Sequence, residues 1–112
     1  MLTLFLSLIA AHALADYPLQ GDFLSKAKNR AAPLPGVPWY QALAAHAAIH
    51  ALFVGILTGV LWLALAEFVL HSLIDDAKCT GKFGTGPRAF DIDQACHVAC
   101  KLLWVICLAY PL

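Results

Sequence analysis

The stretch LWLALAEFVLHSLIDD, residues 61–76, is largely apolar, and within it Glu67, His71 and Asp75 recur at every fourth position. Residues four apart share one face of an α-helix, so this spacing predicts a helix with one ionisable stripe on an otherwise apolar surface. An apolar surface suits lipid as the solvent, and ionisable groups inside a membrane face the protein interior. The stretch therefore predicts a membrane helix that brings three titratable side chains into a helical bundle.

The rest of the sequence has the same apolar character. Hydrophobic residues make up 62% of the 112 residues and charged residues 12%, whereas soluble domains are about half apolar and about a quarter charged. No Asp, Glu, Lys or Arg occurs in residues 31–66. Because a soluble protein of this size could not bury such a stretch, we expect one domain, residues 1–112, in a lipid bilayer.

Four apolar segments are separated by polar loops, and a membrane crossing needs about 20 residues. The predicted helices lie at about residues 2–20, 39–57, 60–76 and 92–110. The loop GDFLSKAKNRAAPLPGVP, residues 21–38, cannot be one continuous helix because three prolines interrupt it. The expected fold class is all-α, an integral membrane four-helix bundle with up-down-up-down topology.

The second and third helices are divided only by a short break. The apolar run from Trp39 to Asp75 is too long for one crossing, and Thr58-Gly59 is the best place to turn, with one long tilted helix as the competing interpretation. The spacing Gly55-x-x-x-Gly59 is that of membrane helices that pack closely. It is also compatible with Gly59 simply forming the turn.

The first segment can be interpreted as a signal peptide or as a membrane helix. Ala13-Leu14-Ala15 has the small-x-small pattern of a cleavage site, but Met1-Leu2-Thr3 lacks the basic region that precedes the apolar core of a secretory signal. We therefore expect the segment to be a membrane helix, in which His12 and Asp16 need a role.

Cations gather in the loops after the first and third helices, and these loops lie on the same side of a four-helix bundle. The residues are Lys26, Lys28, Arg30, Lys78, Lys82 and Arg88. The positive-inside rule places that side in the cytoplasm. We expect a multi-pass protein of the bacterial inner membrane, bacterial or phage-encoded, with both termini outside.

Each predicted helix carries polar residues at four-residue spacing. The sets are His12-Asp16-Gln20, His46-His50, Glu67-His71-Asp75 and Asp93-His97. They lie in the C-terminal halves of the first and third helices and the N-terminal halves of the second and fourth. Those halves share one side of an up-down-up-down bundle. We expect His12, His46, His71 and His97 in one layer, with three aspartates one turn nearer the cytoplasm and His50 and Glu67 one turn deeper.

Buried imidazoles and carboxylates are costly in lipid unless they are paired or bind a metal. The expected metal ligands are His12, Asp16, His46, His50, His71, Asp75, Asp93 and His97. A mixed His/Asp set suits a divalent cation, zinc first, with iron or manganese as alternatives. Glu67 and Asp93 are the candidates for catalytic residues, as bases toward a metal-activated water. The alternative is a hydrogen-bonded belt without metal.

Other charged residues are expected to have ordinary roles. Asp22, Asp76 and Asp91 are predicted to be solvated loop charges, Gln20 a helix-end cap, and Lys101 a partner of Asp93 or Glu67. The sparse basic loops argue against nucleic-acid binding. Besides the bilayer itself, they are compatible with anionic lipid head groups as partners, and a homo-oligomer remains open.

The segments AHALADYPLQ, HAAIHALF, HSLIDDAK and DQACH resemble the signature segments of a family of small bacterial and phage membrane proteins, the domain of unknown function 3307. The resemblance spans nearly the whole chain and implies membrane placement and these motif residues, but no reaction. The His-x-x-x-Asp segments are also similar to those of predicted membrane-bound metal-dependent hydrolases, although Ala47 stands where those proteins commonly carry Arg.

The leading hypothesis is a metal-dependent hydrolase that acts on a lipid or amphipathic phosphoester or ester at the cytoplasmic interface. Two non-enzymatic alternatives remain. The polar layer could conduct or sense protons or metal ions, or it could serve only to hold the bundle together.

Overall fold

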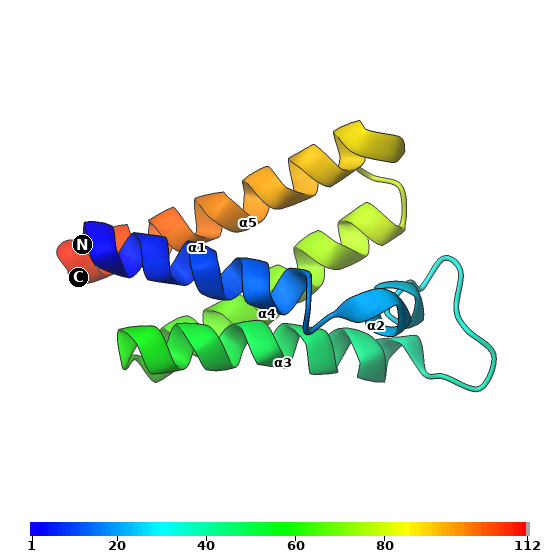
Figure 1. The fold of residues 1–112 in the computed structure, drawn as a ribbon, viewed down its shortest axis with the longest axis horizontal. Helices are drawn as coiled ribbons and strands as arrows, with labels where there is room; N and C mark the ends of the chain where they lie inside the picture. The colour runs from blue at the N-terminus through cyan, green and yellow to red at the C-terminus, as the bar shows by residue number, and fades with distance from the viewer. Residues whose placement is uncertain (112) are drawn as a thin grey trace.

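The computed structural model describes residues 1–111, and within them the chain is helical, with no strand. The helices are α1 (Leu2–Asp16), α2 (Gly21–Ala27), α3 (Trp39–Thr58), α4 (Leu61–Cys79) and α5 (Gly86–Ala109). The four long helices alternate in direction, so that both termini lie at one end and α2 lies at the other (Figure 1). Helix α1 contacts α3 and α5, and α4 contacts the same two helices, so the four enclose a common interior.

The first helix is shorter than the sequence predicted. Helix α1 ends at Asp16 instead of continuing to Gln20, and the separate helix α2 follows at an angle of 84°. The reason is Pro18, which has no N–H to donate and disfavours helical geometry at the residue before it. Gly21 then adopts a φ of 61°, a left-handed conformation that other residues rarely adopt. The 21–38 stretch is therefore not one helix, but it does contain α2, which the sequence did not predict.

The last helix is longer than predicted. Helix α5 begins at Gly86 instead of near residue 92, with Pro87 in its first turn, where a missing N–H costs nothing. Asp91 is exposed as expected, but it lies on this helix and not in a loop. The extra turns extend α5 beyond Asp93 at its N-terminal end.

Helices α3 and α4 form a tight hairpin. Gly59 caps α3 with a φ of 70°, and its N–H donates to the carbonyl oxygen of Gly55 at 2.9 Å. A Cβ atom placed on Gly55 would lie 3.3 Å from the Cβ of Ala64 on α4. The two glycines therefore have different roles: Gly59 makes the turn, and Gly55 lets the helices approach closely.

The molecule has its polar side chains inside and many apolar side chains outside. Leu52, Ile56, Leu65, Val69 and Leu73 are each more than half exposed. Ten polar or charged residues are buried within residues 1–111, namely His12, Lys28, His46, His50, Glu67, His71, Asp75, Asp93, His97 and Lys101. This distribution is the reverse of that in a water-soluble domain and fits a lipid environment.

Helices α3 and α5 are long and apolar enough to cross a membrane, and α1 with α2 counts as a third span if the bent pair is taken as one. Helix α4 is not among them because Glu67, Asp75, Asp76 and Lys78 lie within its 19 residues. Two of these four, Glu67 and Asp75, are at most 2% exposed. The charges that lower the hydropathy of α4 are thus partly hidden in the interior.

An apolar layer closes the interior at the end where the termini lie. Leu8, Val54, Leu63, Trp104 and Val105 pack together there. Leu8 precedes His12 by one turn, Val54 follows His50 by one turn, and Leu63 precedes Glu67 by one turn. The interior is therefore apolar toward the termini and polar toward α2.

We predict that Leu63→Ala lowers the free energy of unfolding by about 2–5 kcal/mol, because it leaves a cavity in this layer. Leu65→Ala is the matched control on the same helix, since Leu65 is 59% exposed and its truncation leaves no enclosed void. Reversible denaturation in detergent micelles measures both. Equal losses for the two variants would contradict the inside-outside arrangement described above.

Candidate metal centre

All five histidines of the chain meet in the interior. They come from all four long helices, and none is more than 4% exposed. The ring centroids of His50 and His71 are 3.7 Å apart, and those of His71 and His97 are 4.1 Å apart. His12 lies 5.1 Å from both His50 and His97. Imidazolium cations would repel one another at these separations, so the rings do not all carry a charge together, and the neutral ring is the form that binds metals.

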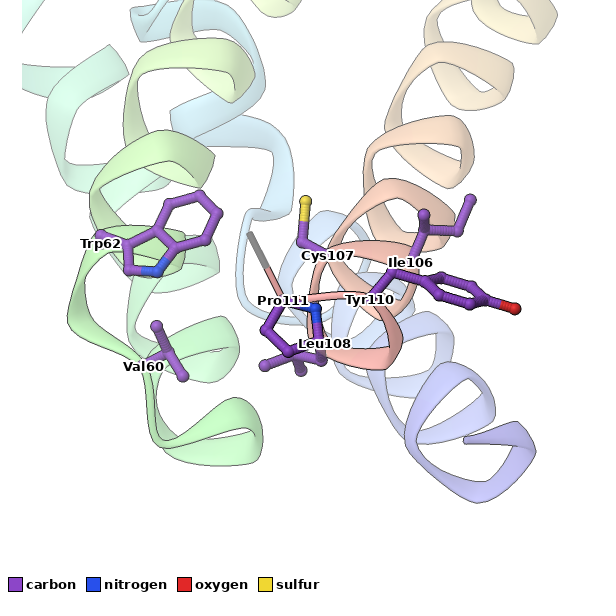
Figure 2. Close-up of a pocket in the computed structure, with 7 residues that line it drawn as sticks. All are labelled: Val60, Trp62, Ile106, Cys107, Leu108, Tyr110 and Pro111. Atoms are coloured by element: carbon purple, nitrogen blue, oxygen red, sulfur yellow. The ribbon is translucent and has the colours of Figure 1, made fainter.

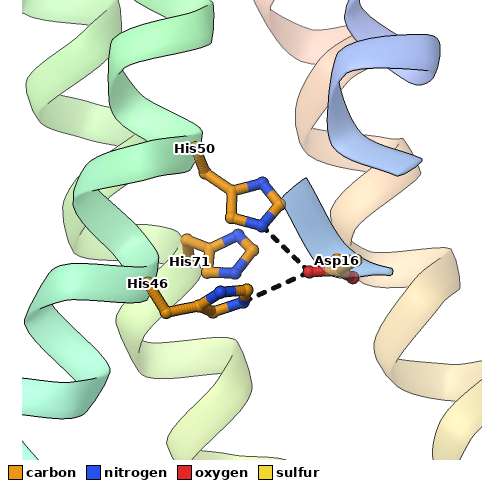
Figure 3. Close-up of side chains that lie close together, drawn as sticks. All are labelled: Asp16, His46, His50 and His71. Carbon is orange, nitrogen blue, oxygen red and sulfur yellow. Dashed lines mark hydrogen bonds and ion pairs between the residues drawn. The ribbon is translucent and has the colours of Figure 1, made fainter. Parts of the chain in front are cut away.

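Asp16 lies at the centre of one side of this cluster, at the last residue of α1. Its Oδ1 is hydrogen-bonded to His50 Nε2 at 2.9 Å and lies 3.2 Å from His46 Nε2 (Figure 3). Its Oδ2 lies 3.2 Å from His12 Nε2 and accepts a hydrogen bond from Gln94 at 2.8 Å. Figure 3 shows the imidazoles of His46 and His50 from α3 directed at this one carboxylate, with the His71 ring beside them. One aspartate therefore serves histidines from α1 and α3.

Asp75 occupies the equivalent position on α4. Its Oδ1 is hydrogen-bonded to His97 Nε2 at 2.9 Å, and its Oδ2 accepts a hydrogen bond from Lys28 Nζ at 2.6 Å. Oδ2 also lies 3.4 Å from the Nε2 atoms of His46 and His71. Asp75 thus faces three imidazoles and one ammonium group.

Asp93 is the third carboxylate of the layer, on α5. Its Oδ2 accepts a hydrogen bond from the Gln94 amide at 3.2 Å and lies 3.9 Å from Lys78 Nζ. Its Oδ1 lies 3.3 Å from His97 Nε2 but has no hydrogen-bond partner among the described residues. Asp93 is the least constrained of the three aspartates.

Three groups of these side chains have ligand atoms within 4.8 Å of one another. They are Asp16-His46-His50-His71, His71-Asp75-His97 and Asp16-Asp93-His97. The first offers four ligands, as structural zinc sites do, and the other two offer three, as catalytic zinc sites do. Because Asp16, His71 and His97 each belong to two groups, the groups form one continuous set of ligands.

Several buried nitrogen atoms in this set have no hydrogen-bond partner within residues 1–111. They are Nδ1 of His12, His46 and His97, together with Nε2 of His46 and both ring nitrogens of His71, which lie 3.2–3.4 Å from carboxylate oxygens without hydrogen-bond geometry. A buried polar atom without a partner costs about 1–3 kcal/mol. A cation that coordinates ring nitrogens would remove part of this cost, so the donor set fits a metal ion.

The charge of the layer also fits a cation. Three carboxylates face one buried ammonium group, that of Lys28, which leaves two net negative charges if the imidazoles are neutral. Lys78 is 35% exposed and stands 3.9 Å from Asp93, so it compensates less. One divalent cation would balance this excess.

Glu67 belongs to a separate layer, one turn toward the termini. Its Oε1 accepts from Lys101 and its Oε2 accepts from the Trp104 indole at 2.6 Å. Lys101 was expected to pair with Asp93 or Glu67, and it pairs with Glu67. Both carboxylate oxygens of Glu67 therefore accept hydrogen bonds. Since His71 Nδ1 lies 3.4 Å from Glu67 Oε1, these contacts fit a residue that positions His71 better than they fit the catalytic base predicted from the sequence.

The structure brings all eight expected ligands together, and one of them lies at a different depth from the depth expected. His50 was expected one turn deeper than the other histidines, yet its ring reaches Asp16 and stacks on His71. Sequence reasoning missed Gln94, whose amide bridges Asp16 and Asp93 while its Oε1 lies 3.0 Å from His12 Nε2. Its only sequence signal is its place between Asp93 and His97.

From the sequence, four charged residues are predicted to lie in loops, and no partners are predicted for them: Lys28, Lys78, Arg30 and Asp76. The structure gives each of them a partner of opposite charge at the α2 end. Lys28 is buried against Asp75, and Lys78 faces Asp93. Asp76 is not a free solvated charge, because it accepts two hydrogen bonds from Arg30 at 3.0 and 2.8 Å. These bonds raise the pKa of the Arg30 guanidinium above its usual value.

The remaining expectations are met in part. Asp22 is exposed and pairs with Lys26 at 2.9 Å. Gln20 does cap a helix end, since its amide donates to the carbonyl oxygen of Asp16 at 3.0 Å.

A cavity of about 660 Å³ lies at the end of the molecule where the termini lie, away from α2. It is lined mainly by apolar side chains where α4 begins and α5 ends, including Trp62 and Val60 on one side and Ile106 and Leu108 on the other (Figure 2). Among residues 1–111, no histidine and no aspartate or glutamate lines it. The polar chemistry is thus confined to the α2 end.

A family model described as a protein of unknown function, DUF3307, matches residues 4–110. No curated protein and no solved structure matches the chain.

We predict that Lys101→Met lowers the free energy of unfolding by about 3–5 kcal/mol, because it leaves the Glu67 carboxylate buried and unpaired. The double variant Glu67→Gln with Lys101→Met should recover most of this loss. Lys26→Met is the control at an exposed pair and should cost less than about 1 kcal/mol. Thermal and chemical unfolding in micelles measure all three, and a Lys101→Met cost no larger than that of the control would refute the buried pair.

Proposed function

Since the chain belongs to the DUF3307 family of proteins of unknown function, its function has to be inferred from its own site, and we propose that it is a membrane-embedded, metal-dependent hydrolase. The substrate is a lipid or another amphipathic ester or phosphoester. The observation that carries the proposal is the convergence of five buried imidazoles and three carboxylates from four helices, with several ring nitrogens that have no hydrogen bond within residues 1–111.

In this proposal all four long helices cross the bilayer. Helices α3 and α5 are each apolar enough to cross alone, and α1 and α2 together are apolar enough to form a bent span. Helix α4 presents Leu65, Val69 and Leu73 to lipid and directs its buried charges inward. Six of the seven lysines and arginines belong to the α2 end, the exception being buried Lys101. The positive-inside rule then puts the α2 end in the cytoplasm of a bacterial cell and both termini outside.

The metal is a divalent cation, zinc first, with iron or manganese as the alternatives. Nitrogen and carboxylate ligands suit all three metals. The four-ligand group Asp16-His46-His50-His71 is the first site for it, and the three-ligand group His71-Asp75-His97, which does not use Asp93, would leave a coordination position for water. His12 and Gln94 hold Asp16 in place from α1 and α5.

A bound divalent cation supplies a water molecule that ionises near neutral pH. Asp93 is the residue for proton transfer, because its Oδ1 is buried and has no hydrogen-bond partner in the described part of the chain. In the hydrolysis, the water oxygen bonds to the carbonyl carbon or phosphorus, the ester bond to the alcohol oxygen breaks, and the water proton leaves with the alcohol.

The apolar closure of the termini end favours hydrolysis over conduction. The Glu67–Lys101 pair and the apolar layer of Leu8, Val54 and Leu63 stand between the histidines and the far end. A proton or metal channel would need a polar route through this layer. Vesicles that contain the protein and a pH- or zinc-sensitive dye test this alternative, with His71→Ala as the control; flux that depends on His71 would favour conduction.

We predict that the purified chain binds at least one equivalent of divalent metal and that chelation lowers its melting temperature. His71→Ala should lose most of this metal, since His71 belongs to two ligand groups. Ser72→Ala is the matched control, because the Ser72 hydroxyl bonds only to the carbonyl oxygen of Phe68, outside the cluster. Elemental analysis and thermal melts measure both. An empty wild-type protein whose melting temperature is unchanged by chelator would refute the metal proposal.

We predict that Asp93→Asn lowers kcat for hydrolysis of an amphipathic ester or phosphoester by about 100-fold or more, because proton transfer is lost. The metal of the four-ligand group should remain, and elemental analysis checks that it does. Asp91→Asn is the control, since Asp91 is exposed on the same helix. Equal activity of the two variants would exclude Asp93 as the base.

A further inference from the structure

A polar cavity of about 270 Å³ opens at the α2 end, beside the layer of histidines and of Asp16, Asp75 and Asp93 that would hold the metal, called the metal layer below. It is lined by Gln20, Ser25, Lys28, Asn29, Lys78 and Cys79. The lining comes from the turn before α2, from α2 and the residues after it, and from the end of α4. The bend between α1 and α2 places the first two of these opposite the end of α4, across the cavity.

The two cations of this cavity also touch the carboxylates of the metal layer. Lys28 Nζ donates to Asp75 Oδ2 at 2.6 Å, and Lys78 Nζ lies 3.9 Å from Asp93 Oδ2. Each ammonium group has three protons, so each has donors left for a further oxygen. An anion in the cavity would therefore lie next to the metal ligands and between two positive charges.

The other lining residues supply neutral hydrogen-bonding groups. Asn29 uses its Oδ1 to accept from the backbone N–H groups of Ala31 and Ala32 at 2.9 and 3.3 Å, which leaves its amide N–H groups free to donate. Gln20 donates to Asp16, while its Oε1 is buried without a partner among the described residues. Ser25 adds a hydroxyl group. Several donors and one buried acceptor thus surround the cavity.

We propose that this cavity binds the phosphate group of a phosphorylated amphiphile, which, resting on the proposed function, narrows the substrate from esters in general to phosphate esters. Two ammonium groups and further donors around one volume suit a tetrahedral group with several anionic oxygens better than a carboxylic ester, which has no charge. Gln20 Oε1 accepts from a protonated phosphate oxygen or from a head-group hydroxyl. Tyr17, Leu19 and Phe23, which are exposed in the turn before α2 and in α2 itself, provide apolar surface for the attached chain.

The test uses the full chain in a neutral detergent, both metal-loaded and after chelation. The probes are inorganic phosphate and dihexanoyl phosphatidic acid, and binding is measured by calorimetry and by ³¹P line broadening. We expect both probes to bind the metal-free protein, and Lys78→Gln to weaken binding at least fivefold. Lys26→Gln, an exposed lysine of α2 paired with Asp22, should leave binding unchanged.

Lys78 is chosen over Lys28 because Lys78 is partly exposed, so we expect its replacement to leave the fold intact. Gln20→Ala is the second variant, and thermal melts check that both variants are folded. Equal binding to wild-type and Lys78→Gln protein, or binding that disappears when metal is removed, overturns the proposal. Tighter binding of phosphatidic acid than of phosphate identifies a lipid head group, and equal binding identifies free phosphate. Lysine-dependent binding to a protein that neither holds metal nor hydrolyses esters would support the cavity and refute the hydrolase.

Discussion

Every buried ionisable side chain in this protein needs a partner, because the outer surface of the helices is apolar and offers none. The chain meets this requirement in layers along the bundle. Glu67 is paired with Lys101 and Trp104, the histidines surround Asp16, Asp75 and Asp93, and Lys28 closes the layer nearest to α2. Removing one group from such a layer leaves its partner unpaired in a low-dielectric interior. The members of a layer therefore stabilise the bundle only together.

The hydrogen bonding of the buried polar groups is complete in the Glu67 layer and incomplete in the histidine layer of the described chain. We therefore assign the Glu67 layer a structural role and the histidine layer the proposed ligand site. Glu67 has both oxygens engaged, as a group that only holds helices together should. His46 and His71 have ring nitrogens without hydrogen-bond partners in the described chain, next to carboxylates with excess negative charge. Unsatisfied buried groups of this kind are where ligands bind, because a ligand can recover the cost of leaving them unpaired.

The early end of α1 connects the fold to the site. Asp16 is the last residue of the helix, so its carboxylate reaches between α3 and α5 and not along a continuing helix. The chain then bends by 84° and returns through α2, which delivers Lys28 to Asp75. One proline thus positions both a carboxylate of the histidine layer and a cation of the adjoining cavity.

The four-residue spacing of Glu67, His71 and Asp75 and the absence of charge in residues 31–66 were enough to predict an all-helical chain and a shared polar interior. Periodicity determines which residues share a helix face, because the helical repeat is fixed by local geometry. It does not determine how far a side chain reaches across the bundle. The predicted ligand His50 reached Asp16, and the unpredicted residues Gln94 and Lys28 joined the site, through contacts between residues 34 to 82 positions apart in the chain. Only tertiary packing decided those contacts, because they depend on where α1 ends and how α2 folds back, and no local repeat records either.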